Sequence, residues 1–176
     1  VELDLGGIAK GYAVDRAVDI LRAAGITSAL VSSGTSTVYA LGAPPGERAW
    51  KIIVRDPYDP EKPADVVLLK NFSLSASGNY EKFFKVGNKL YAHILDPRRG
   101  RPAEGMLATT VLAPQATESD ALSTAFFVLG VQRSGDHLAR HPNLAALFYQ
   151  PGKLLPSFKR TALRSPSYTL PTDSLA

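Results

Sequence analysis

The sequence predicts an α+β fold, and the prediction depends on two observations. Two stretches repeat apolar residues with the period of a helix, whereas most other apolar residues stand in short runs bounded by Gly, Pro or Asn. These segments alternate irregularly, with several hairpin patterns and few β-α-β units, which favours α+β over a doubly wound parallel sheet. The length of 176 residues suits one domain, with a core over residues 1–150 and a C-terminal strand and tail over residues 151–176.

The first half of the chain begins with a predicted strand that leads into Gly6-Gly7, followed by a helix over residues 8–24. Apolar residues of this helix recur once per turn, and Gly25 is a typical C-terminal stop. Short strands follow, with a hairpin turn predicted at Gly87-Asn88 between the last two. They cover residues 29–31, 37–41, 50–54, 66–69, 72–76, 83–86 and 89–95.

The second half contains the strongest strand pattern, a β-branched run over residues 107–112. A helix is predicted over residues 118–129 and ends at Gly130, and a third, short helix covers residues 131–140. The last core strand is expected over residues 144–149. Residues 151–176 are rich in Ser, Thr, Pro and Leu, so we expect at most one strand there before a loose tail.

Composition excludes several classes of function. Apolar residues make up 45% and charged residues 20%, which is typical of a globular protein and excludes a disordered chain or a fibre. The net charge of +4 is spread along the chain rather than clustered in a stripe, so we expect no nucleic-acid binding. The absence of cysteine excludes a thiol nucleophile, a Cys-bound metal and disulfides. No run approaches the roughly 18 apolar residues of a membrane span.

The segment from Asp4 to Tyr12 joins the opening strand to the first helix. Its paired glycines, Gly6 and Gly7, let the backbone approach a ligand closely, and the free N–H groups of the helix N-terminus attract anions such as phosphate. The glycine spacing matches neither a P-loop nor a dinucleotide-binding motif. A tight strand-to-helix turn with an exposed Lys10 is the alternative.

His93 is the better candidate among the three histidines, because it ends a strand beside an Asp96-Pro97 turn. His137 and His141 lie one helical turn apart, but no Glu stands between them as in zinc proteases, so we expect both on the surface. A lone histidine is structural more often than catalytic, and this alternative stays open for His93 on the sequence pattern alone.

The start of the second helix carries a carboxylate and hydroxyls. Asp120 and Thr124 lie one turn apart and therefore share a face, with Ser123 beside them. These hard oxygen ligands suit magnesium, with phosphate oxygens and water completing its coordination. Alternatively, Ser119 or Asp120 caps its own helix.

Taken together, these segments resemble the ApbE family, the FAD:protein FMN transferases. The resemblance covers residues 1 to about 150 and consists of short blocks in the order of the family. The blocks are Asp4 with Gly6-Gly7-Ile8-Ala9-Lys10-Gly11-Tyr12-Ala13-Val14-Asp15, Ser33-Gly34-Thr35-Ser36 with Ala40-Leu41-Gly42, Ser75-Ala76-Ser77-Gly78-Asn79-Tyr80-Glu81, His93-Ile94-Leu95-Asp96-Pro97 with Gly100 and Pro102, and Ser119-Asp120-Ala121-Leu122-Ser123-Thr124-Ala125 with Val128-Leu129-Gly130.

The resemblance implies an ApbE-like fold, with mixed or antiparallel sheets flanked by helices. It also implies magnesium-dependent cleavage of the FAD pyrophosphate, transfer of FMN to a Ser or Thr hydroxyl of an acceptor protein, and release of AMP. Two alternatives stay open. The protein hydrolyses FAD to FMN and AMP, or it is a non-catalytic FAD-binding or degenerate ApbE-like domain.

The family's metal ligands carry over to the side chains of Asp120 and Thr124 and to the backbone carbonyl of Gly7, or of Ala9 if the carbonyl is shifted. Ser123 stands where some members have an Asp ligand, and we include it more weakly.

The family's FAD contacts carry over to Asp4, Lys10 and the backbone near Leu95. Lys10 and magnesium would together offset the charge that grows on the leaving phosphate. His93 matches the histidine implicated in transfer, and an imidazole can accept a hydroxyl proton near neutral pH.

Family members also have a long part upstream of the Asp4 block that contacts the flavin ring and the adenine. We therefore expect this chain to be N-terminally truncated, with a lipid anchor among the features that the upstream segment would carry. The resemblance further implies an acceptor that is a flavinylated subunit of a respiratory or electron-transfer complex, and a location on the periplasmic side of the inner membrane.

Overall fold

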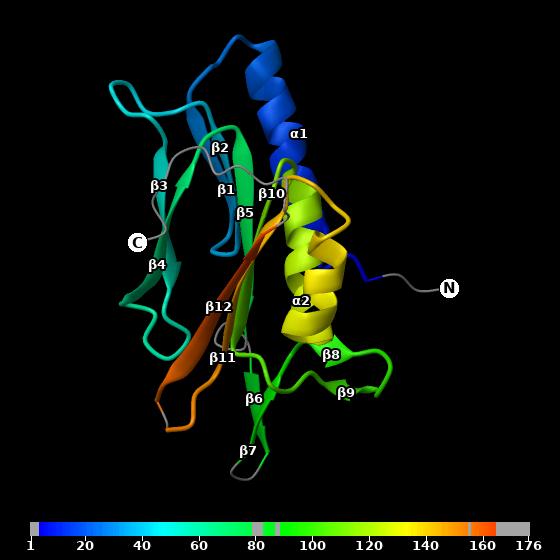
Figure 1. The fold of residues 1–176 in the computed structure, drawn as a ribbon. Coiled ribbons are helices and arrows are strands. Elements are labelled where there is room, and N and C mark those ends of the chain that lie inside the picture. Colours follow the sequence, from blue (N-terminus) through cyan, green and yellow to red (C-terminus); the bar gives the residue numbers. More distant parts are fainter. Residues whose placement is uncertain (1–3, 79–82, 87–88, 155, 165–176) are drawn as a thin grey trace.

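A six-stranded antiparallel sheet forms the centre of the fold (Figure 1). The computed structural model describes residues 4–78, 83–86, 89–154 and 156–164. The strands of the sheet stand in the order β1 (Ala29–Ser33), β2 (Thr37–Leu41), β5 (Phe72–Gly78), β10 (Ala108–Ala113), β11 (Ala145–Pro151) and β12 (Phe158–Arg164).

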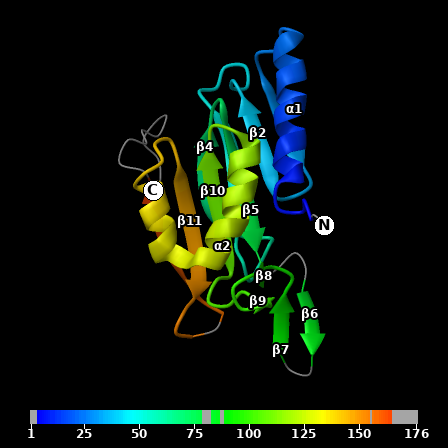
Figure 2. The same ribbon diagram turned by 90° about the vertical axis from the view of Figure 1, so that its right-hand side faces the viewer.

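Three hairpins supplement the central sheet, and each pairs antiparallel. They are β3 (Trp50–Arg55) with β4 (Pro63–Leu69), β6 (Phe83–Val86) with β7 (Lys89–Ala92), and β8 (Leu95–Asp96) with β9 (Arg101–Pro102). The helices α1 (Ala9–Ala23) and α2 (Ala116–Leu138) cover one face of the central sheet, and the β3–β4 hairpin covers the other (Figures 1 and 2). The α+β prediction is confirmed.

The two faces of the sheet carry separate hydrophobic clusters. In β2, Tyr39 and Leu41 pack with Val14 and Val18 of α1. Ala40, which points to the opposite face, packs in the cluster beneath the β3–β4 hairpin. Because successive side chains of a strand alternate between faces, a strand that is covered on both sides has apolar residues at consecutive positions.

Helix α2 consists of two segments that meet at Gly130. This residue has φ 75° and ψ 176°, a backbone conformation that interrupts the helix and that favours glycine. Figure 2 shows the resulting bend. The two predicted helices over residues 118–129 and 131–140 are therefore confirmed, with the first beginning slightly earlier, at Ala116. No helix in the described part of the chain is both long and apolar enough to cross a membrane.

The predicted strand over residues 89–95 is confirmed for residues 89–92, which form β7, but it does not continue through His93 and Ile94. The side chain of Ile94 turns into the core beneath α2, where it is only 7% exposed. The chain then pairs Leu95 and Asp96 with β9 instead of continuing β7. His93 therefore lies at a bend and not in a strand.

The predicted opening strand is not found at Asp4 and Leu5, the part of it that the structure describes. Asp4 and Leu5 are irregular, and the carbonyl of Leu5 accepts hydrogen bonds from the amides of Ile8 and Ala9, so the chain is already turning into α1. Residues 1–3 and the Gly87-Asn88 turn lie outside the described residues. At the other end, the single strand expected after residue 150 is β12, which pairs with β11 along its full length.

Candidate active site

The two helices touch through their backbones at Gly11. A Cβ atom added there would lie 2.2 Å from the carbonyl oxygen of Ala116 and 2.7 Å from the Cα of Thr117. Only glycine permits so close an approach. The contact brings the first turns of α1 and α2 together, although they are more than a hundred residues apart in the chain.

Each helix supplies a carboxylate to the N-terminus of the other. On α1, Asp15 accepts hydrogen bonds from the backbone amides of Ala116 and Thr117, both at 2.8 Å. On α2, Asp120 accepts one from the amide of Gly11 at 2.9 Å. The N-cap residue of α2, Gln115, makes no side-chain cap. The alternative in which Asp120 caps its own helix is therefore wrong, because Asp15 fills that role from α1.

The second oxygen of Asp120 faces a cation. Oδ1 lies 3.3 Å from the ammonium of Lys10 and 3.2 Å from the hydroxyl of Thr37 on β2. The same ammonium lies 3.3 Å from the carbonyl oxygen of Gly6. Asp120 is 2% exposed, so its charge depends on these partners for compensation.

Hydroxyl groups join α2 to β5 beside Asp120. They come from Ser73, Ser75 and Ser77 on the helix-facing side of β5 and from Ser119, Ser123 and Thr124 on α2. Ser119 bonds Ser73 at 2.8 Å and Ser75 at 2.7 Å, and Ser75 continues to Thr37 at 3.2 Å. This chain of hydroxyls holds the turn of α2 that carries Asp120 against the sheet.

Ser123 belongs to this helix–sheet interface. Its hydroxyl donates to the carbonyl of Asp120 at 2.9 Å and bonds Ser77 at 2.8 Å, and the residue is fully buried. Thr124 is half-buried, and its hydroxyl lies 3.1 Å from that of Ser77. A Cβ added at Gly7 would lie 3.6 Å from the Thr124 hydroxyl, so Gly7 and Thr124 face each other.

A cavity of about 640 Å³ opens above these groups. Most of the site residues expected from the sequence line it: Asp4, Gly7, Lys10, His93, Leu95 and Thr124. The other two do not line it: Asp120 is buried and contacts the cavity-lining Lys10, and Ser123 lies in the helix–sheet interface. The structure therefore brings together residues from the two ends of the predicted set, which the chain separates by more than a hundred positions.

An aspartate–arginine pair stabilises the turn that follows His93. Asp96 accepts hydrogen bonds from the guanidinium of Arg98 at 2.9 and 2.8 Å, and Arg98 also donates to the carbonyl of Val128 on α2 at 3.3 Å. These charge-assisted hydrogen bonds hold the pKa of the Asp96 carboxyl below its ordinary value. His93 and Leu95, which precede this pair in the chain, are exposed and line the cavity.

The other two histidines lie away from the cavity. The prediction that both are on the surface is right for His141 and wrong for His137, which is half-buried. The ring of His137 packs edge-on against Phe126 at 5.5 Å and stacks on His141 at 3.8 Å between centroids. Burial, and then the charges of His141 and Arg140, lower the pKa of His137.

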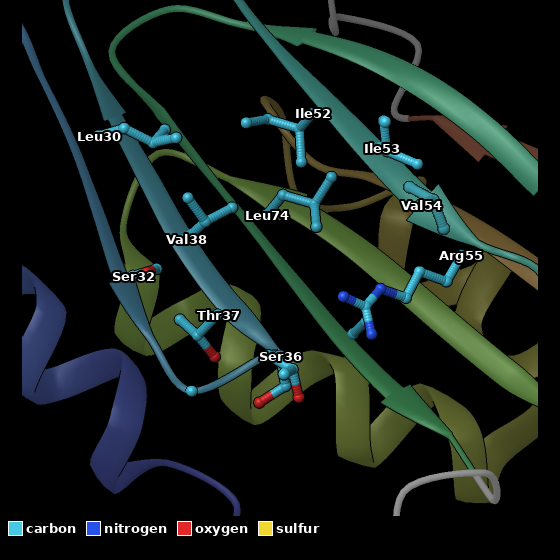
Figure 3. A pocket seen from close by; sticks show the side chains of 13 residues that line it. Leu30, Ser32, Ser36, Thr37, Val38, Ile52, Ile53, Val54, Arg55 and Leu74 are labelled. Atoms are coloured by element: carbon cyan, nitrogen blue, oxygen red, sulfur yellow. The ribbon is translucent and has the colours of Figure 1, made fainter. Parts of the chain in front are cut away.

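A second hollow lies on the opposite face of the sheet, between β3 and the strands β1, β2 and β5. It has a volume of about 210 Å³ and shares the β1–β2 turn, residues 34–36, with the cavity. Figure 3 shows Arg55 at its end, with the guanidinium directed toward Ser36. Arg55 forms none of the ion pairs found among the described residues. No sequence motif indicated this hollow.

The oxygens near Asp120 fit a hard divalent cation. The Asp120 carboxylate and the Gly6 carbonyl already contact one positive charge, the ammonium of Lys10. The Thr124 hydroxyl and the Gly7 backbone line the same cavity as Lys10. Such oxygen donors are those that magnesium prefers. Within the described ranges, no group of three or more His, Asp or Glu residues is arranged as a metal site.

An antiparallel sheet, two helices that meet at their first turns and a cavity with cationic and oxygen-rich walls define a class of α+β domain suited to a phosphorylated ligand. The chain belongs to the ApbE family, whose model matches residues 1–148.

Curated relatives carry the name FAD:protein FMN transferase. That of Treponema pallidum (strain Nichols) is 40% identical over 163 residues, which cover 87% of this chain and 45% of the relative. That of Rhodobacter capsulatus is 42% identical over 130 residues, covering 74% of this chain and 24% of the relative. The chain thus spans less than half the length of these two proteins.

Solved structures match the fold. The ApbE protein from Thermotoga maritima superposes with a TM-score of 0.80 and 36% identity, covering 95% of this chain and 52% of the other. The flavinyl transferase ApbE from Pseudomonas stutzeri gives a TM-score of 0.76 with 33% identity, covering 94% and 50%. The expected ApbE-like fold is confirmed.

Proposed function

We propose that this chain carries the phosphate-handling part of an FAD:protein FMN transferase. The reaction is the magnesium-dependent transfer of FMN from FAD to a Ser or Thr hydroxyl of an acceptor protein, with release of AMP. One observation carries the proposal: a single cavity gathers Asp4, Lys10, His93 and Thr124 beside the buried carboxylate of Asp120. The names of the curated relatives support the transfer of FMN from FAD to a protein.

The transfer exchanges one P–O bond for another. The acceptor oxygen forms a bond to the FMN phosphorus, the bond from that phosphorus to the bridging oxygen breaks, and AMP leaves with the bridging oxygen. When bound by Asp120, Thr124 and the Gly7 carbonyl, magnesium supplies positive charge to the pyrophosphate. Lys10 adds a second positive charge to the same wall of the cavity.

His93 is the group placed to take the proton of the acceptor hydroxyl. It is exposed at the cavity, on a bend just before the turn that contains the Asp96–Arg98 pair. Asp4 and the backbone near Leu95 are the proposed FAD contacts. Asp4 is already ordered, because its Oδ1 accepts a hydrogen bond from the Gly6 amide at 2.7 Å.

The test uses the full-length protein with FAD, magnesium and an acceptor peptide. We expect AMP release in step with covalent flavin on the peptide, and loss of both in Asp120→Asn. Asp19→Asn is the matched control, since it removes an exposed carboxylate on the outer face of α1. Release of AMP with free FMN and an unmodified peptide would identify a hydrolase instead, and FAD binding without AMP release would identify a binding protein.

The acceptor and the location of the protein remain predictions from the family resemblance. The acceptor would be a flavinylated subunit of a respiratory or electron-transfer complex, and the protein would work on the periplasmic side of the inner membrane. Cell fractionation that found the full-length protein only in the cytosol would contradict the location.

A further inference from the structure

The ammonium of Lys10 contacts the carboxylate that is proposed to bind the metal ion. It lies 3.3 Å from Oδ1 of Asp120 and 3.3 Å from the carbonyl oxygen of Gly6, at the first turn of α1. The Lys10 side chain is 37% exposed and lines the cavity, whereas the Asp120 side chain is 2% exposed. Lys10 is therefore a cation that connects the buried carboxylate with the cavity.

Two hydrogen bonds within the fold also use the Asp120 carboxylate. Oδ2 accepts the Gly11 amide at 2.9 Å, a bond that depends on the backbone contact between the helices. Oδ1 accepts the Thr37 hydroxyl at 3.2 Å in addition to Lys10. Lys10 lines the cavity and contacts Oδ1, so a cation that reaches Oδ1 from the cavity meets the Lys10 ammonium.

An ammonium and a divalent ion that both contact one carboxylate oxygen repel each other strongly, because the site is partly buried and solvent screens their charges only weakly. This repulsion disfavours the simultaneous presence of both cations at one carboxylate oxygen. Lys10 has a long, flexible stem and already lines the cavity, so it can move away without changing the backbone.

We propose that Lys10 and the divalent ion bind Oδ1 of Asp120 in turn. The metal displaces the ammonium, and the released Lys10 extends into the cavity, where it can pair with a phosphate of the substrate. This inference rests on the proposed function and adds an order to it: the metal binds first and thereby frees the lysine for the pyrophosphate. Lys10 consequently opposes metal binding while it supports substrate binding.

The first experiment measures Mn²⁺ binding to the full-length protein by electron paramagnetic resonance, with no FAD present. Lys10→Met and Lys10→Gln remove the competing charge, so we expect each to bind Mn²⁺ at least about tenfold more tightly than the wild type. Lys159→Met is the matched control and should leave the affinity unchanged, since Lys159 is an exposed lysine on β12.

The outcomes separate the two proposals. Equal or weaker Mn²⁺ binding in both Lys10 variants would overturn the displacement of Lys10 and leave the metal site intact. If neither the wild type nor the variants bind Mn²⁺, the metal site in the proposed function fails, and the displacement fails with it.

The second experiment follows the Lys10 amine directly. The wild type is labelled with an amine-reactive ester with and without Mg²⁺, and the modified lysines are quantified by mass spectrometry. Displacement predicts faster labelling of Lys10 when Mg²⁺ is present, relative to Lys159 in the same sample. An unchanged ratio, or protection of Lys10 by Mg²⁺, would overturn the proposal.

Discussion

The carboxylates of Asp15 and Asp120 each accept a hydrogen bond from the first turn of the helix that carries the other. Asp15 of α1 holds the amides of Ala116 and Thr117, and Asp120 of α2 holds the amide of Gly11. The first amides of a helix have no partner within the helix, and they carry its positive dipole end. The reciprocal pair therefore joins the helices and orients the proposed metal-binding carboxylate.

Removing the Asp15 carboxylate should destabilise the protein. Asp15→Ala leaves two amides of α2 without their acceptor, and we expect the free energy of unfolding to fall by about 1–2 kcal/mol. Urea denaturation measures the change. Asp19→Ala, one turn further along α1, removes only an exposed pair with Arg16 and should change stability by less than about 0.5 kcal/mol. Equal effects in the two variants would refute the capping role.

The contact at Gly11 should not tolerate a side chain. In Gly11→Ala the Cβ would meet the Ala116 carbonyl at 2.2 Å, so the helices must separate, at a cost of about 1–3 kcal/mol or more. Mn²⁺ binding should fall with stability, because the Asp120 bond to the Gly11 amide is broken.

Gly135 provides the matched control for this glycine. It is also helical, but a Cβ there would meet only Leu163 Cδ1 at 3.5 Å, an ordinary contact. Gly135→Ala should be neutral or stabilise the protein by up to about 1 kcal/mol through helix propensity. Thermal denaturation of both variants distinguishes a loss of stability at the Gly11 helix contact from a general effect of glycine in helices.

His93 should affect transfer rather than FAD binding. If it takes the proton of the acceptor hydroxyl, His93→Ala should slow covalent flavin transfer by roughly 10²–10⁴-fold. FAD affinity should change little, since Lys10 and the metal-binding residues remain. His141→Ala is the control, because His141 lies outside the cavity and should transfer flavin at the wild-type rate. A parallel loss of FAD affinity and transfer in His93→Ala would make His93 a binding residue.

The Asp96–Arg98 pair should give stability that is lost in acid. The hydrogen bonds from Arg98 lower the pKa of Asp96 from 3.8, so the folded state binds the proton less readily than the unfolded state. The contribution is complete above about pH 4 and disappears as the pH falls through the lowered pKa.

Urea denaturation across this range tests the pair. Asp96→Asn should be less stable than the wild type at pH 7, and the difference should shrink below pH 3.8. Arg98→Gln should reduce the same pH dependence, because it removes the side-chain hydrogen bonds that are the largest cause of the shift. A difference that stays constant from pH 7 to the acid range would contradict this account.

Local features were enough to predict much of the fold. The helix around residues 8–24 and the division of α2 at Gly130 follow from periodicity and from a glycine that can adopt a positive φ. The split of the strand over residues 89–95 was missed, because Ile94 is as good a strand residue as its neighbours. Ile94 differs from its neighbours only in the folded protein, where its side chain is buried in the core beneath α2.

The sequence by itself determined which residue types stand at the candidate site, since the blocks around Lys10, His93 and Asp120 follow the order of the ApbE family. It left open whether Asp120 serves its own helix, because a carboxylate near a helix N-terminus can bond its own amides or those of a neighbour. The tertiary structure decided this through Gly11, which lets the helices meet so closely that Asp15 takes the α2 amides and Asp120 turns to α1. Contacts across more than a hundred residues depend on packing, and packing leaves no local pattern in the chain.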